Sequence, residues 1–299
     1  MQRNLTKGPI TVNLLLFALP LMFGNLLQQL YNVIDTWVVG RYLGADALAA
    51  VGSSYTLMTF LTSILLGLCI YAYLKVKDIR ITKEDMHWSR ENLSMILNLS
   101  VMTSLQQSIM NFGILMVQGL VNSFGTVIMA AFAAAVKIDS FAYMPVQDFG
   151  NAFSTYVAQN YGANEKKRIQ DGIKSAVLMS MAFCVVVSFL VCIFAKPLMG
   201  IFIDKGEGAI IAAGVHYLHI EGACYVGIGM LFLLYGYYRA INQPVMSVIL
   251  TIASLGTRVL LAYILSAIPV IGVTGIWMSV PIGWFFADLI GIFYYFRKR

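Results

Sequence analysis

Long apolar segments without charged residues are the feature that most restricts how this chain can fold. Residues 176–195 contain no charged side chain, and about 20 residues of helix are enough to cross a bilayer. Similar segments recur along the 299 residues, of which 59% are hydrophobic and 11% are charged. This composition excludes a soluble globular protein, and the length of the segments excludes a barrel. We therefore predict an all-α polytopic membrane protein.

About eight membrane helices are predicted, separated by clusters of Gly, Pro and Asn. Their ranges are 12–39, 47–74, 96–122, 126–160, 173–203, 209–239, 244–268 and 273–296. The first range is too long for the apolar core of a signal peptide, so we expect it to stay in the membrane. A hydrophilic segment of mixed charge, residues 75–92, is interpreted as a cytoplasmic linker rather than a lipid-binding helix. It divides the chain into a two-helix part, 1–74, and a six-helix part, 93–299.

Lysine and arginine residues are distributed unequally between the two sides of this topology. With a cytoplasmic N-terminus, the outer side contains only Arg41, Lys196 and Lys205, whereas the other basic residues outside the helices lie on the inner side. This asymmetry predicts an even number of crossings with both termini in the cytoplasm. The net charge of +6 thus reflects membrane topology, and it does not indicate nucleic-acid binding.

An internal repeat relates the two parts of the chain. The sequence LQQ occurs at residues 27–29 and again at 105–107, and each copy begins a similar pair of helices. Parallel repeats of this kind are found in secondary transporters. The second copy begins a unit of six helices, but the first is followed by only two. Either the duplication was partial or the first unit has lost its later helices.

The first predicted helix carries an acidic residue, Asp35, with Gln28, Tyr31 and Asn32 on the same helix face. A carboxylate is costly inside a membrane, so the favoured interpretation is an ion or proton site that faces the protein interior. The alternatives are an interhelical polar contact and an interfacial position.

Further polar residues occur deep in the second unit. Gln107 and Asn111 lie in one helix, and Lys137 lies roughly 16 Å into the next at 1.5 Å per residue. The remaining deep charges are Asp139, Glu221, Arg258 and Asp288. We predict interhelical pairing among these charges: a structural role is favoured for Arg258 and Asp288, while Gln107, Asn111, Lys137, Asp139 and Glu221 are candidates for lining a transport cavity.

Enzymatic activity is not expected. The sequence has no evident nucleophile motif, phosphate-binding loop or metal-ligand spacing, and we predict no cofactor. His216 and His219 are interpreted as interfacial rather than catalytic.

Three segments carry a resemblance to a known family: QQLYNVIDTWVVGRYLGADALAAVG, the stretch LQQSIMNFGILMVQGLVNSFGTVIMAAFAAAVKIDSFAYMPVQDFG, and YGYYRAINQP. Together they resemble the MATE (multidrug and toxin extrusion) transporters, specifically the DinF-like bacterial branch. The resemblance implies twelve helices in two lobes, and export of cationic or amphipathic compounds in exchange for H⁺ or Na⁺ by alternating access. It also implies a cation-coupling role for Asp35 and a location in the bacterial inner membrane.

The chain departs from the family pattern after residue 67, where the sequence resembles the start of the second family helix and then the end of the sixth. We therefore predict a truncated N-terminal lobe, a complete six-helix C-terminal lobe and poor transport by this version alone. The partners expected are the lipid bilayer and a small organic cation or amphipathic drug. The alternatives are a flippase for lipid-linked saccharides and a non-transporting membrane scaffold that associates with itself.

Overall fold

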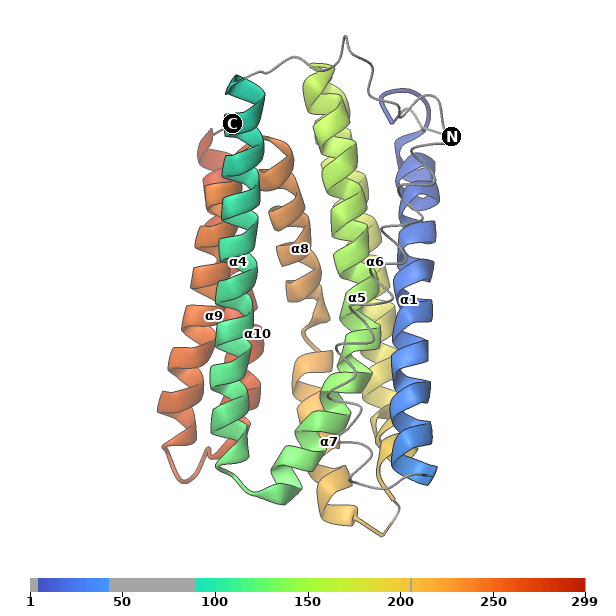
Figure 1. Cartoon of the computed structure of the whole chain (residues 1–299), viewed down its shortest axis with the longest axis vertical. Coiled ribbons are helices and arrows are strands. Elements are labelled where there is room, and N and C mark those ends of the chain that lie inside the picture. The colour runs from blue at the N-terminus through green and yellow to red at the C-terminus, as the bar shows by residue number, and fades with distance from the viewer. Residues whose placement is uncertain (1–4, 43–89, 205, 299) are drawn as a thin grey trace. The chain divides into compact units, whose positions relative to one another are not determined.

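The computed structural model describes residues 5–42, 90–204 and 206–298, and every element in this part of the chain is a helix (Figure 1). The helices are α1 (Ile10–Tyr42), α4 (Arg90–Asn122), α5 (Thr126–Gly162), α6 (Lys166–Phe202), α7 (Gly208–Gly222), α8 (Tyr225–Ala240), α9 (Pro244–Ser266) and α10 (Val273–Lys298). The prediction of an all-α membrane protein is confirmed. The predicted helix 47–74 lies outside the described residues, and the domain boundaries at 74 and 92 stay predictions.

Five of these helices are long and apolar enough to cross a membrane by themselves: α1, α5, α6, α9 and α10. The pair α7 and α8 adds a sixth candidate span, bent by 52°. Helix α4 has the length of a span, but polar residues such as Gln106, Gln107 and Asn111 interrupt its apolar sequence. Large apolar side chains remain exposed along the helices, including Leu178, Phe189, Leu289 and Phe293, as expected for a surface that contacts lipid.

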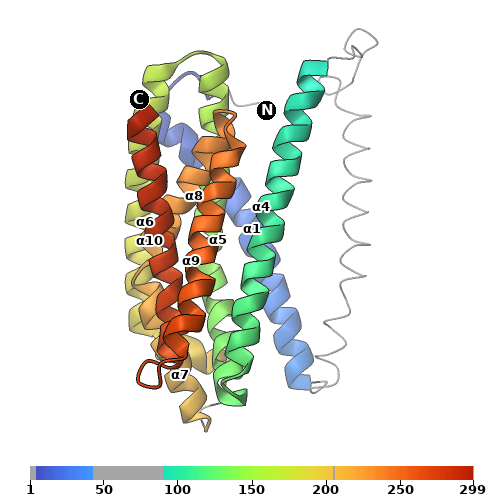
Figure 2. The ribbon, with the colours of Figure 1, turned by 90° about the vertical axis from the view of Figure 1, so that its left-hand side faces the viewer.

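Two units make up the chain, one formed by Met1–Leu27 with Asn98–Arg299 and one by Gln28–Leu97. The second unit contributes the C-terminal part of α1 and the first turns of α4 to the described residues. In the first unit, α9 and α10 run side by side in both views, and α5 packs on α6, α7 and α8 (Figures 1 and 2).

Glycines allow the helices of the first unit to approach closely. A Cβ atom at Gly236 of α8 would lie 2.5 Å from the carbonyl oxygen of Gly150 in α5. At the α9–α10 contact, a Cβ atom at Gly283 would lie 2.4 Å from the carbonyl oxygen of Ser254. Small residues at such contacts are the usual means by which membrane helices gain van der Waals packing, because lipid provides no hydrophobic force between them.

The N-terminal segment is fixed to the turn between α5 and α6. The guanidinium of Arg168 donates hydrogen bonds to the carbonyl oxygens of Leu5 and Gly8 at 3.1–3.2 Å and to Asn160 at 3.2 Å. The side chains of Leu5 and Leu14 are buried against α5 and α6. The N-terminal segment therefore lies at the end of the bundle where α5 ends and α6 begins.

Three predicted helices differ from the structure, one in its continuity and two in where they begin. The range 209–239 is two helices, because Cys224 leaves the helical conformation (φ −113°, ψ 13°) and the chain bends there. Helix α6 begins at Lys166 rather than 173, since its polar first turns are helical as well. Helix α4 begins at Arg90, so the last residues of the predicted linker 75–92 are helical.

Candidate functional site

A cavity of about 210 Å³ lies within the first unit, enclosed by α4, α5, α7, α8, α9 and α10. Its walls are mainly apolar and aromatic, with Ile114, Phe132, Leu231 and Trp284 among the lining residues. Three charged side chains share this lining: Asp139 of α5, Glu221 of α7 and Arg258 of α9. We call this space the acid cavity, because it has two carboxyl groups and one basic group.

Asp139 is held by two tyrosine hydroxyl groups from the neighbouring helices. The Tyr225 hydroxyl at the start of α8 donates a short hydrogen bond to Oδ1, and the Tyr217 hydroxyl of α7 donates to Oδ2 at 3.3 Å. The Asp139 side chain is only 5% exposed. Hydrogen bonds to both oxygens satisfy a carboxyl group that would otherwise be costly to bury, and they fix its orientation.

An aromatic cluster positions Tyr217. Its ring packs edge-on against Phe132 and Trp277 at centroid distances of 5.5 and 5.0 Å, while those two rings stack on each other at 5.4 Å. Both tyrosines that bond Asp139 are almost fully buried. Such packing leaves the ring one orientation, so the hydroxyl group stays directed at the carboxylate.

The second acid lies where the helical span is broken. Glu221 is in the last turn of α7, is 2% exposed, and its Oε1 atom is buried without a hydrogen-bond partner. Its backbone carbonyl accepts a hydrogen bond from the Cys224 amide at 2.9 Å, which closes the end of the helix. Discontinuous helices that place charged groups at a cavity are a recurrent feature of ion sites in transporters.

Arg258 is the basic member of the cavity. It lies close enough to interact electrostatically with both Asp139 and Glu221, and its Nε atom is buried without a hydrogen-bond partner. The structure thus brings together three of the charges that were predicted to pair. Asp288 is buried in α10, its Oδ1 atom has no hydrogen-bond partner, and it does not line this cavity.

The other candidates of the second unit lie elsewhere. Lys137 of α5, and Gln107 and Asn111 of α4, are exposed and do not line the acid cavity. Sequence reasoning expected Lys137 to be paired or to face water, and in the structure its side chain is on the surface of the described residues. His216 and His219 are exposed, as expected for interfacial residues, and contact Thr274 and the carbonyl oxygen of Cys192.

The candidate coupling residues of the first helix are a separate case. Gln28, Tyr31, Asn32 and Asp35 belong to α1, but their side chains lie outside the described residues. Their coupling role stays a prediction.

A partly buried hydrogen bond that the sequence did not predict joins α1 to α5. The Asn25 amide donates to Asp148 Oδ1 at 2.6 Å, and the other oxygen of Asp148 is buried without a partner. No periodicity marks this pair, because its members are 123 residues apart.

The family of the chain follows from a comparison with protein-family models. The MatE model matches residues 20–70 and 99–264, which is most of the chain. The chain belongs to the MatE family. This assignment confirms the resemblance to MATE transporters, and the second matched segment contains α5, α7 and α8 with Asp139 and Glu221.

Curated relatives in this family are considerably longer. The chain is 23% identical to the probable multidrug resistance protein YoeA of Bacillus subtilis, over 95% of this chain and 66% of that protein. It is 24% identical to the probable multidrug resistance protein YpnP of the same organism, over 88% of this chain and 58% of the relative. The chain therefore spans less than two thirds of the length of either.

Solved structures show the same fold. A crystal structure of MATE in complex with MaL6 superimposes with a TM-score of 0.74, at 22% identity over 86% of this chain and 58% of that one. A transporter of the MOP superfamily from Pyrococcus furiosus gives a TM-score of 0.73, at 22% identity over 86% and 57%.

Proposed function

We propose that this chain is a cation-coupled exporter of cationic or amphipathic compounds, in which Asp139 and Glu221 bind the coupling ion. The observation that carries the proposal is the acid cavity itself: two buried carboxyl groups beside one arginine inside a membrane bundle. Buried intramembrane charges of this kind are a functional-site hypothesis by default, because charge is costly to bury there and is therefore rare. A location in the bacterial inner membrane, with both termini in the cytoplasm, belongs to the same proposal.

The charge of the cavity fits the binding of one monovalent cation. With both carboxyl groups ionised and Arg258 positive, the lining has one more negative than positive charge. One proton or one Na⁺ ion brings the cavity to neutrality, which lowers the cost of enclosing it in a medium of low dielectric. The Asp139 and Glu221 oxygens supply hard ligands suited to either ion.

The small volume of the acid cavity favours the coupling ion, rather than the exported compound, as its ligand. A volume of about 210 Å³ is below the range of about 300–1,000 Å³ that is typical of sites for drug-sized ligands. The bend between α7 and α8 lies directly after Glu221, so a change in the charge of the cavity is transmitted to the one break in this span. Cation binding is then coupled to conformation, because the bent arrangement of α7 and α8 differs in stability with and without the bound cation.

The test measures ion binding before transport. Trp284 lines the acid cavity and Trp277 packs on Tyr217, so ion binding should change the tryptophan fluorescence of the purified protein. We expect a saturable response to Na⁺ or to pH that Asp139→Asn and Glu221→Gln remove. The matched controls are Asp204→Asn and Glu207→Gln, two exposed acids between α6 and α7. A response that survives in both cavity variants contradicts the proposal.

Export is then measured as efflux of a fluorescent cationic dye from proteoliposomes with an imposed Na⁺ or pH gradient. The gradient that drives efflux identifies the coupling ion. We further propose that the N-terminal lobe is truncated by an internal deletion and that export by this chain alone is weak, because alternating access needs two lobes. Strong pH-dependent export that Asp35→Asn abolishes would contradict this second proposal.

The origin of the short N-terminal lobe has its own test, namely reading the genomic DNA across the codons for residues 67–75. A continuous reading frame there supports a natural deletion, and additional sequence between these codons excludes it.

The rival functions predict other results. A flippase for lipid-linked saccharides needs a strongly basic cavity to hold phosphate groups, and the acid cavity has more acidic than basic residues. A scaffold that completes a lobe by association with a second copy would give crosslinked dimers in native membranes, and it would show no fluorescence response to cations.

A further inference from the structure

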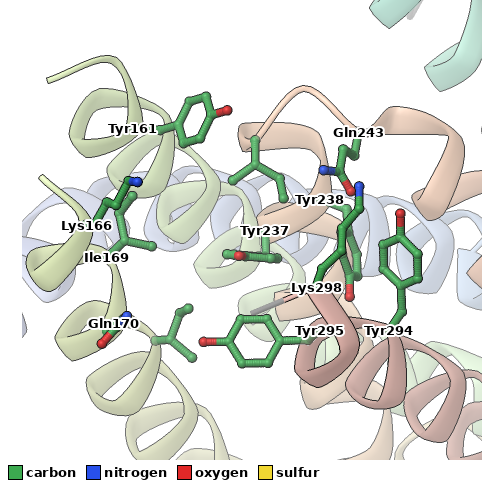
Figure 3. Close-up of a pocket in the computed structure, with 12 residues that line it drawn as sticks. Tyr161, Lys166, Ile169, Gln170, Tyr237, Tyr238, Gln243, Tyr294, Tyr295 and Lys298 are labelled. Carbon is green, nitrogen blue, oxygen red and sulfur yellow. The ribbon is translucent and has the colours of Figure 1, made fainter. Parts of the chain in front are cut away.

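A second cavity, of about 320 Å³, lies at the end of the bundle where α5 ends and α6 begins (Figure 3). The ends of α8 and α10 form its other side. We call it the terminal cavity; its polar and aromatic lining residues are Tyr161, Lys166, Gln170, Tyr237, Tyr238, Gln243, Tyr294, Tyr295 and Lys298. None of the residues that line it is acidic.

The two lysines enter the terminal cavity from opposite sides. Lys166 is in the first turn of α6, and Lys298 is in the last turn of α10 (Figure 3). Lys298 Nζ lies 5.2 Å from the centroid of the Tyr294 ring, which holds the ammonium group at the cavity. Among the described residues, neither ammonium group has a carboxylate partner, so both positive charges are available to a ligand.

The neighbouring arginines are already used by the fold. Arg168 binds the N-terminal segment, and Arg239 donates to the carbonyl oxygen of Tyr235 and to Asn151. The side chains of both arginines are thus engaged in contacts within the fold. The two lysines differ from them because their charges are not used in this way.

Tyrosine hydroxyl groups surround the space between the lysines. The Tyr295 hydroxyl points from α10 toward α6, and Tyr161 projects from the end of α5 (Figure 3). Tyr238 is committed elsewhere, since it donates to the carbonyl oxygen of Gly291 at 2.6 Å. Tyrosines are enriched where membranes meet water, because the ring is apolar and the hydroxyl group bonds to head groups.

Apolar groups continue the terminal cavity toward the membrane. Ile169, Ile173 and Ile241 line its walls, Phe293 and Phe296 are exposed beside the lining residues of α10, and Leu178 is exposed more than one turn beyond Ile173 on α6. A ligand that fits this combination has an anionic head and a long apolar part.

We propose that the terminal cavity binds the head group of an anionic phospholipid, with its phosphate between Lys166 and Lys298 and its acyl chains along α6 and α10. The basic residues at this end make it the cytoplasmic side by the positive-inside rule, where anionic lipid head groups are available to the site. Two lysines and tyrosine donors suit a phosphodiester, whereas the acid cavity excludes one by charge. The bound lipid would tie the α5–α6 turn to the ends of α8 and α10.

The test uses native mass spectrometry of the full chain with phosphatidylglycerol and with phosphatidylcholine of the same acyl chains. Each lysine near a membrane surface contributes about fivefold to the preference for anionic lipid. The double variant Lys166→Gln, Lys298→Gln should lose most of the preference. The matched control is Lys7→Gln with Lys167→Gln, which removes the same charge from two exposed residues at the same end that do not line the cavity.

Two further measurements separate loss of lipid binding from misfolding and from binding of a soluble ligand. Lys166→Arg with Lys298→Arg retains both charges and should retain the preference, which separates loss of binding from misfolding. Inorganic phosphate at millimolar concentration tests for a soluble ligand. Equal loss in the double variant and its control would overturn the proposal, because it would indicate diffuse surface charge. Displacement of the lipid by phosphate alone would overturn it too, because the apolar part would then contribute nothing.

Discussion

The acid cavity and the terminal cavity share helices α5, α8 and α10 but have opposite chemistry. On α8, Ile228, Leu231, Phe232 and Tyr235 line the first cavity, while Tyr237 and Tyr238, with Ile241 just after the helix, line the second. The acid cavity holds buried carboxyl groups that depend on tyrosines from other helices. The terminal cavity has exposed lysines at helix ends, where water can solvate them. The placement of charged side chains in the interior therefore depends on contacts between helices. At the end of the bundle, their placement depends mainly on where each helix ends.

The largest effect on both cavities is expected from displacing α8, one of the three helices that they share. Gly236→Val would place a Cβ atom 2.5 Å from the Gly150 carbonyl oxygen and force α8 away from α5. Overpacking of this kind costs about 1–3 kcal/mol. We expect a lower melting temperature of the solubilised protein, with loss of both the fluorescence response to cations and the preference for anionic lipid.

Gly200→Val is the matched control, since a Cβ atom at this helical glycine meets no other atom within 4 Å. If Gly236→Val removes one response and leaves the other intact, α8 does not position the two cavities together.

Much of the fold followed from the sequence, because membrane helices are specified by local composition. The segments 126–160, 244–268 and 273–296 are mainly apolar, and each agrees with a helix of the structure to within a few residues. The break after Glu221 was missed, since Gly222, Ala223 and Cys224 are small residues that also occur inside helices. In the structure Gly222 packs closely against Val191 of α6, where a Cβ atom would lie 3.3 Å from Cγ1, a contact that the local sequence does not reveal.

The sequence identified the charged members of the acid cavity but not their partners. Asp139, Glu221 and Arg258 stand out, because charge is rare in apolar segments. Tyr217 has a weak signal, as it lies one turn before Glu221 on the same helix face. Tyr225 has none: it is one of 16 tyrosines, and only the bend between α7 and α8 directs it at Asp139. Gln107 and Asn111 were equally polar candidates, but they are exposed on α4 and do not line the cavity.

A narrower change affects the acid cavity alone. Tyr225→Phe removes one of the two hydroxyl groups that bond Asp139 and keeps the ring. A hydrogen bond to a charged group contributes about 1.5–3 kcal/mol, so the midpoint of the fluorescence response to the coupling ion should shift by about 10-fold to about 100-fold. The lipid preference should not change.

Tyr263→Phe, at an exposed tyrosine of α9, is the control for Tyr225→Phe and should leave the midpoint in place. An unchanged midpoint in Tyr225→Phe would show that the hydroxyl group does not orient the ion-binding carboxylate.

The smallest change expected is confined to the terminal cavity. Lys298→Gln removes one of its two positive charges and should reduce the preference for phosphatidylglycerol about fivefold, while the response to cations persists. Arg297→Gln removes the same charge from the adjacent residue, which does not line the cavity, and should have little effect. Because salt screens exposed charges, the difference between these two variants should decrease from 0.1 M to 1 M salt, where the Debye length falls from about 10 to about 3 Å. Equal effects of both substitutions would mean that the lipid preference depends only on the total charge of the C-terminal turn. The terminal cavity would then have no ligand specificity to compare with that of the acid cavity.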